Sequence, residues 1–244
     1  MLDGSTSKGN FSFDGKTSGR IAMEIVGKAI HSFSPCAELK EVVEYLTNTL
    51  QTFYREHGLL DLVTGKPENR PTCSLALYSR FQHQIWLIGD VQCRIDGKTY
   101  TNSKHIDNVL GRIRADVLNY FLQTGFTEDE LRNNDKGRQM ILPYLREQCH
   151  FQNAASDNPF AYAVIDGFKV NTDLIKVVDT KDAHDIILAS DGYPEVYDSL
   201  NETEQALEKE LQADSLRCRQ HFSTKGMMNN AFSFDDRTFL RIKP

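Results

Sequence analysis

The sequence predicts an α+β fold. Segments with helical periodicity come in pairs, and short apolar segments typical of strands come in hairpins rather than alternating singly with helices. The composition agrees, because 40% of the 244 residues are hydrophobic and 25% are charged, as in a globular protein with a sizeable core. No linker rich in proline or glycine divides the chain, so we expect residues 1–244 to form a single domain.

Two helices are predicted near the start of the chain. The elements in order are a turn-rich opening at 1–17, a helix at 18–33, a helix at 35–53 and a polar loop at 58–70. Apolar residues recur at helical spacing from Ile21 and again from Leu39, which places them on one face of each helix. Pro35 suits the first turn of the second helix.

The rest of the chain predicts strands, then helices, then strands again. The elements in order are hairpin strands at 73–78 and 85–88, a turn at Asp96-Gly97, a helix at 103–123, a helix from Thr127, strands at 160–165, 174–178 and 185–189, a helix from Asn201, a loop at 222–234 and a last strand at 238–242. Short apolar runs bounded by turn residues indicate the strands. Thr127 and Glu130 form a capping box, which marks a helix start.

Charge, hydropathy and cysteine spacing exclude several classes of protein. The net charge is −6 and no Lys/Arg cluster alternates with aromatics, which argues against nucleic-acid binding. The longest apolar run, at 160–165, is far below the ~18 residues of a membrane-spanning helix, and the first residues lack signal-peptide features, so we expect a cytoplasmic protein. The five cysteines include no CxxC pair, which favours reduced thiols over disulfides or a zinc site.

Several aspartates stand beside predicted strands. Asp90 follows the strand at 85–88, Asp191 follows the strand at 185–189, and Asp235 precedes the last strand. Asp3 lies beside Gly4 ahead of the first helix. Carboxylates that meet at one rim of a sheet repel one another unless a cation lies among them, and oxygen ligands suit Mg²⁺ or Mn²⁺. Taken singly, each Asp-Gly pair is more typical of a turn.

Four segments carry a more specific pattern. In chain order they are Asp3-Gly4, Gly89-Asp90 within 85–95, Leu188-Ala189-Ser190-Asp191-Gly192, and Asp235-Asp236-Arg237-Thr238. In this order and context the sequence resembles the metal-dependent protein phosphatases of type 2C, which are serine/threonine phosphatases with a two-metal centre. The segments together span most of the chain.

The resemblance implies a four-layer α-β-β-α sandwich, with two antiparallel sheets flanked by helix pairs. It implies that Asp3, the Gly4 carbonyl, Asp191 and Asp235 bind two Mg²⁺ or Mn²⁺ ions, with Asp90 nearby or at a third, weaker metal. Asp3 and Asp191 would then be catalytic. The implied reaction is hydrolysis of phosphoserine or phosphothreonine in a phosphoprotein substrate by a metal-activated hydroxide.

The sequence also departs from the family. Members have an opening strand before Asp-Gly, with a Glu-Asp pair and an arginine that binds phosphate, whereas Asp3 is the third residue here. Many have a histidine after Asp-Gly where this chain has Ser5, a poor general acid. Tyr193-Pro194 follows Gly192 where Leu-Trp is commoner. These departures favour an alternative function, a catalytically impaired module that binds or regulates phosphoproteins.

Overall fold

The computed structural model describes residues 1–6, 9 and 11–244, and residues 7, 8 and 10 of the predicted turn-rich opening lie outside the described residues. The described part of this opening forms one short strand and a two-stranded hairpin. These strands are β1 (Leu2–Gly4), β2 (Ser12–Phe13) and β3 (Lys16–Thr17).

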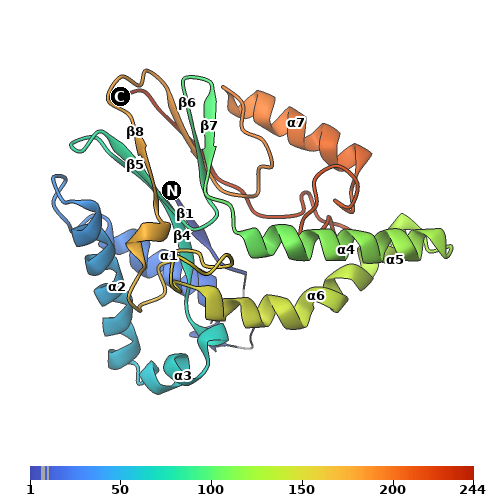
Figure 1. Cartoon of the computed structure of the whole chain (residues 1–244), viewed down its shortest axis with the longest axis horizontal. Helices are drawn as coiled ribbons and strands as arrows, with labels where there is room; N and C mark the ends of the chain where they lie inside the picture. The colour runs from blue at the N-terminus through green and yellow to red at the C-terminus, as the bar shows by residue number, and fades with distance from the viewer. Residues whose placement is uncertain (7–8, 10) are drawn as a thin grey trace.

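Two four-stranded antiparallel sheets form the centre of the fold (Figure 1). The first has the order β1, β4 (Cys73–Ser79), β5 (Gln84–Ile88) and β8 (Lys176–Asp179). The second has the order β10 (Phe239–Ile242), β9 (Ile186–Ala189), β6 (Gln92–Ile95) and β7 (Lys98–Thr101). The turn between β6 and β7 contains Asp96 and Gly97 at positive φ, which confirms the predicted turn.

Strand periodicity places one apolar layer between the sheets and one on each outer face. On β5, Ile85 and Leu87 face the layer between the sheets, while Trp86 and Ile88 face the opposite side. On β9, Ile186 and Leu188 face the same inner layer, while Ile187 and Ala189 face outward. This alternation confirms the predicted α+β sandwich of two antiparallel sheets.

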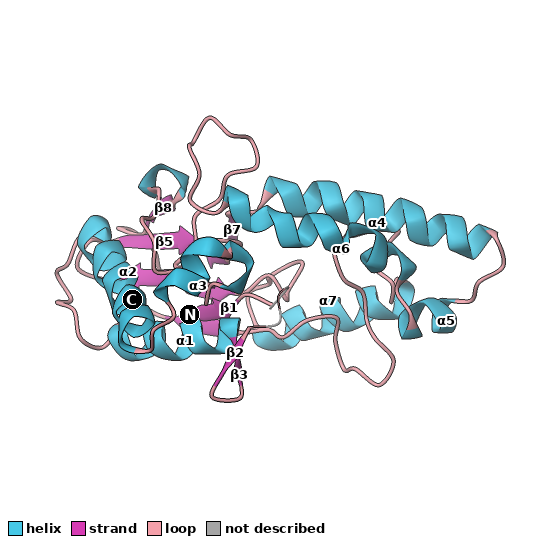
Figure 2. Ribbon diagram, turned by 90° about the horizontal axis from the view of Figure 1, so that it is seen from below, coloured by secondary structure: helices cyan, strands magenta, loops and turns pink. Residues whose placement is uncertain are grey.

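Helices cover the outer faces and extend beyond one end (Figure 2). Helices α1 (Ser18–Ala29) and α2 (Leu39–Glu56) pack on the first sheet through a shared apolar cluster. Helix α7 (Leu200–Ala213) packs on the second sheet through Leu207 and Leu211. Helices α4 (His105–Gln123) and α6 (Lys136–Glu147) lie side by side, with the short α5 (Glu128–Asn133) between them in the chain. The capping box of Thr127 and Glu130 at the start of α5 is confirmed.

Four predicted elements differ from the structure. The second helix, predicted at 35–53, begins only at Leu39 with Glu38 as its N-cap, so Pro35 lies in the preceding turn and not in the first helical turn. The apolar run at 160–165 forms only isolated bridges, because its residues fill gaps in two apolar clusters instead of joining a sheet. The predicted loop at 58–70 contains α3 (Leu60–Gly65) and a 3₁₀ turn (Pro67–Asn69), held by the buried Val63. The first helix ends at Ala29, so Phe33 contacts the core from a turn.

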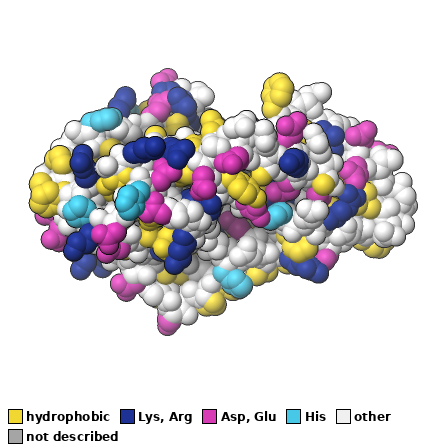
Figure 3. All heavy atoms as spheres, turned by 90° about the horizontal axis from the view of Figure 1, so that it is seen from above, with side chains coloured by type: hydrophobic (Ala, Val, Ile, Leu, Met, Phe, Trp, Pro, Cys, Tyr) yellow, Lys and Arg dark blue, Asp and Glu magenta, His cyan; other side chains and the backbone are white. Residues whose placement is uncertain are grey.

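The surface shows no single-sign patch on the face seen in Figure 3, where basic and acidic side chains are interspersed. A hollow lies near the centre of this face, with acidic side chains at its bottom. Among the described residues, no helix is both long and apolar enough to cross a membrane. All five cysteines are free thiols, and Cys36 is the exposed one.

Candidate active site

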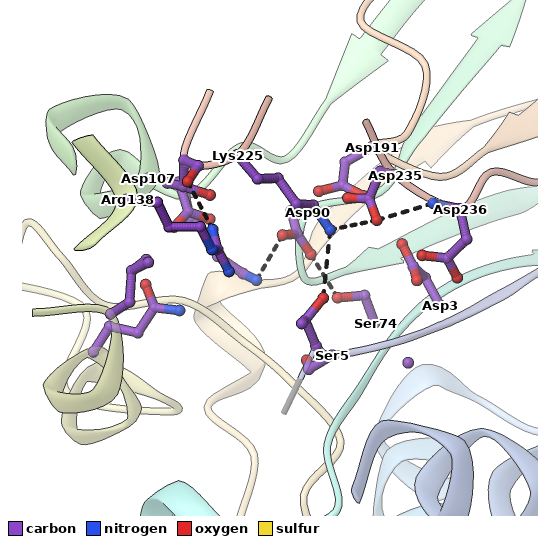
Figure 4. A pocket seen from close by; sticks show the side chains of 16 residues that line it. Asp3, Ser5, Ser74, Asp90, Asp107, Arg138, Asp191, Lys225, Asp235 and Asp236 are labelled. Atoms are coloured by element: carbon purple, nitrogen blue, oxygen red, sulfur yellow. Dashed lines mark hydrogen bonds and ion pairs between the residues drawn. The ribbon is translucent and has the colours of Figure 1, made fainter. Parts of the chain in front are cut away.

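Strand ends from both sheets bring the predicted site residues to one cavity of about 70 Å³ (Figure 4). Asp3 and Gly4 end β1, and Asp90 lies two residues after β5. Asp191 follows β9, and Asp235 precedes β10, the strand that pairs with β9. Antiparallel pairing of β1 with β4 and of β9 with β10 sets these ends at the same rim. The cavity therefore collects all the residues that the sequence singled out.

Burial and mutual repulsion make this an unfavourable place for carboxylate charge. Burial is the largest effect on Asp3 and raises its pKa to about 6, with the charges of neighbouring aspartates adding to the rise. A hydrogen bond between the Asp3 and Asp191 side chains opposes it. Burial, together with Asp90, Asp3 and Asp235, raises the pKa of Asp191 well above its usual value. Burial also raises the pKa of Asp235.

Asp90 is in a different state from the other three. Burial acts to raise its pKa, but Lys104 and Ser74 outweigh this effect and lower the pKa to about 2. Lys104 Nζ lies 2.6 Å from Asp90 Oδ2, and Ser74 Oγ donates to Oδ1 at 2.6 Å. Gly89 permits this arrangement, because its φ is +83° and a Cβ would overlap Ser74 Oγ. Asp90 is thus an ionised, firmly held carboxylate.

Lys225 supplies a second cation to the cavity. It comes from the loop between α7 and β10, and its ammonium group forms an ion pair with Asp235 Oδ1. It also lies 3.4 Å from Thr6 Oγ1. Its charge acts to lower the pKa of Asp235 but does not overcome the effect of burial.

The aspartates of the cavity suit a hard divalent cation, because their donor atoms are oxygens. Asp3, Asp191 and Asp235 offer carboxylate oxygens beside the Gly4 backbone, and burial raises the pKa of each, so a bound cation would favour their charged forms. Their geometry is not that of a preformed shell, since no group of three or more His, Cys, Asp or Glu side chains in the described ranges is arranged to hold a metal ion. In this arrangement one of the predicted ligands, Asp235, is paired with Lys225.

Several residues of the cavity carried no signal in the sequence. They are Ser74, Lys104, Asp107, Arg138 and Lys225. Asp236, which also lines the cavity, lies in the segment 235–238 that the sequence singled out, although it was not proposed as a ligand. Ser74 could have been included because it lies in a predicted strand. Nothing in the local pattern distinguishes Lys104, Arg138 or Lys225 from the other basic residues, because only the fold places them beside the aspartates.

A groove of about 460 Å³ adjoins the cavity. It shares Asp90, Asp191 and Asp235 with the cavity and continues along a polar wall with a few aromatic rings. Residues that line it away from the cavity include Gln92, Asn108, Tyr193, Gln220 and Phe222. Its volume is in the range of ordinary ligand pockets, whereas the cavity is several times smaller.

Comparisons with known proteins give structural similarity only. No family model matches the sequence, and no curated protein matches it. The solved structures that resemble the chain include serine/threonine phosphatase PstP/Ppp from Mycobacterium tuberculosis (14% identity, 89% of this chain, 77% of that chain, TM-score 0.36). They also include Stp1 from Staphylococcus aureus (13% identity, 95% of this chain, 80% of that chain, TM-score 0.40). A third is the catalytic domain of PstP in complex with two manganese ions (14% identity, 80% of this chain, 68% of that chain, TM-score 0.35).

Proposed function

We propose that this chain is a metal-dependent protein serine/threonine phosphatase. The observation that carries the proposal is the cavity in which Asp3, Asp90, Asp191 and Asp235 meet from separate strand ends, three of them with pKa values raised by burial. Such a set is stabilised by cations, and cations in a carboxylate cavity are a means of hydrolysing phosphoric esters. The segments that resemble type 2C phosphatases supply the same residues.

The residues of the cavity would have different roles in the reaction. Asp3, Asp191, Asp235 and the Gly4 carbonyl would hold two Mg²⁺ or Mn²⁺ ions, which when bound lower the pKa of water and stabilise negative charge on a phosphoryl group. Asp90 adds negative charge to the same cavity and stays ionised because of Lys104. Ser5 lines the cavity but is a poor proton donor to a leaving group, so we assign it no acid–base role.

The shapes of the two spaces support a phosphoprotein as the substrate. The cavity admits only a small group, whereas the adjoining groove could hold the residues that flank a phosphoserine or phosphothreonine. The groove's mixture of amide, hydroxyl and aromatic side chains suits an extended polypeptide more than a compact apolar ligand.

The test is hydrolysis of p-nitrophenyl phosphate and of a phosphothreonine peptide with Mn²⁺, with Mg²⁺ and with a chelator. Asp191→Asn should lower the metal-dependent rate by roughly 100-fold or more. Loss of a residue that only supports a metal ligand costs about 10- to 100-fold, and loss of a ligand itself should cost at least as much. The variant should fold, because asparagine removes a repelled charge from a buried position. Asp116→Asn, an exposed aspartate on α4, is the matched control and should keep full activity. An unchanged rate in Asp191→Asn contradicts the proposal.

One observation favours the alternative, a catalytically impaired module that binds phosphoproteins. Lys225 pairs with Asp235, so a lysine rather than a metal ion can neutralise part of the acidic cavity. For such a module, the folded protein would release no phosphate with either metal but would bind the phosphothreonine peptide in preference to its unphosphorylated form.

A further inference from the structure

We propose that Arg138 binds the phosphoryl group of the ligand in the aspartate cavity. This inference deepens the proposed function, on which it rests, by naming a residue that recognises the phosphoryl group. It comes from a comparison of the cationic side chains that line the cavity, which are Lys104, Arg138 and Lys225 among the residues the structure describes.

Two of these three cations are already paired with carboxylates. Lys104 lies 2.6 Å from Asp90, and Lys225 forms an ion pair with Asp235. Within the described ranges, the structure shows no carboxylate within ion-pair distance of the Arg138 guanidinium. Arg138 is therefore the cavity cation whose charge is open to an added anion.

The position of Arg138 is well defined. Its backbone N–H donates to the N-cap residue Asp135 at 2.7 Å, which anchors the first turn of α6. Nη1 of the guanidinium donates to the backbone carbonyl of Thr224 at 2.7 Å. A guanidinium has five N–H donors in a planar fork, so one hydrogen bond leaves several donors for a ligand. The helix thus presents a fixed cation to the cavity.

The environment of Arg138 is costly without an anion. Burial lowers the pKa of Arg138, with Arg114 adding to the decrease, while Asp135, Asp235 and Asp107 act in the opposite direction. A partly desolvated guanidinium without a close counter-ion is stabilised when an anion binds it, and a planar fork suits the oxygens of a phosphoryl group. Arg138 lines the cavity but not the adjoining groove, so it would contact the phosphoryl group and not the flanking polypeptide.

A purely structural arginine in this protein has different surroundings. Arg114 is fully buried, and its Nε and Nη2 donate to Asp135 at 2.9 and 2.7 Å. Its Nη1 donates to the carbonyl of Ser223 at 2.9 Å. Arg114 thus has a carboxylate partner and several hydrogen bonds inside the fold, whereas Arg138 has the carbonyl of Thr224 and faces the cavity. The contrast favours ligand binding over a structural role for Arg138.

The test compares wild type with Arg138→Gln, Arg138→Lys and the control Arg55→Gln. Arg55 is an exposed arginine on α2 that bonds only to Gln51 among the described residues. Binding of inorganic phosphate is measured by equilibrium dialysis with Mg²⁺ present, and binding of Mn²⁺ is measured separately by electron paramagnetic resonance. Arg138→Gln should weaken phosphate binding by roughly 10- to 100-fold, as expected for loss of charged hydrogen bonds. Arg138→Lys should be intermediate, and Arg55→Gln should match wild type.

The pattern of results separates ligand binding from a structural role. Loss of phosphate binding with unchanged Mn²⁺ affinity and unchanged thermal midpoint supports the inference, as does a rise of KM larger than any fall of kcat for p-nitrophenyl phosphate. Phosphate binding by Arg138→Gln that equals wild type overturns it, and so does a wild type that binds no phosphate. A wild type that binds phosphate through Arg138 yet hydrolyses no ester supports the inference and refutes the proposed enzymatic function.

Discussion

The pair Lys104–Asp90 allows the strongest quantitative prediction, which is that Lys104→Met destabilises the protein. The two side chains are 8% and 18% exposed, and their charged atoms lie 2.6 Å apart. Methionine keeps much of the length of lysine but removes the ammonium, so Asp90 is left as an unpaired, mostly buried carboxylate. Loss of one partner of a buried pair costs about 3–5 kcal/mol.

Lys104 has the largest share among the interactions that lower the pKa of Asp90, ahead of the hydrogen bond from Ser74. The fall from the usual 3.8 to about 2 corresponds to roughly 2 kcal/mol of stabilisation of the charged form, and it persists although burial acts in the opposite direction. A double-mutant cycle with Asp90→Asn should therefore give a coupling free energy clearly above the roughly 0.5 kcal/mol that independent sites show. The double variant should be more stable than Lys104→Met alone, because it contains no unpaired charge.

The assay is urea unfolding of the four proteins with a chelator present, so that metal binding does not contribute to stability. The midpoints are followed by circular dichroism, and the slopes should agree among variants if unfolding stays two-state. A coupling free energy below about 0.5 kcal/mol would refute the reasoning, because such a value is typical of independent sites. It would mean that solvent, rather than Lys104, stabilises the Asp90 carboxylate.

Three further predictions concern the frame of the cavity and its pH dependence. Gly89→Ala should destabilise the protein by about 2 kcal/mol or more in urea unfolding, because φ is +83° and the new Cβ would displace Ser74. Gly137→Ala should cost about 1–3 kcal/mol in the same assay, because its Cβ would lie 2.6 Å from the Arg114 carbonyl oxygen; no change would show that α4 and α6 can separate freely. The pKa of Glu204 is lowered, and the largest cause is its hydrogen bonds from Arg237. This ion pair therefore stabilises the protein fully above the unfolded-state pKa of 4.5, and its contribution is lost as the pH falls through the lower folded-state pKa. Glu204→Gln should thus be less stable than wild type by at most about 1 kcal/mol at neutral pH, where the pair is partly screened by solvent. The difference should shrink as the pH falls below 4.5 in unfolding experiments, and a difference that grows toward acid would contradict this sign.

Local patterns in the sequence were sufficient for much of the fold. The alternation along β5 and β9, the capping box at Thr127 and the turn at Asp96 each depend on interactions within a few residues, so they are readable from the chain. The run at 160–165 shows the limit of this reading. Its apolar composition correctly indicates burial, but pairing into a sheet depends on free neighbouring strand edges, which no local pattern reveals.

The candidate site also contains residues that the sequence reveals and residues that only the structure reveals. Aspartates at strand ends are visible in the sequence, because a buried strand carries its terminal carboxylate to the rim of its sheet, and the structure places Asp3, Asp90, Asp191 and Asp235 around one cavity. Their functional roles remain predictions. The cations could not be foreseen, because Lys104, Arg138 and Lys225 come from a helix boundary, a helix and a loop far apart in the chain. The sequence determined where negative charge accumulates, and only the tertiary structure decided which cations neutralise it, because charge pairing depends on distances of a few ångströms between distant segments.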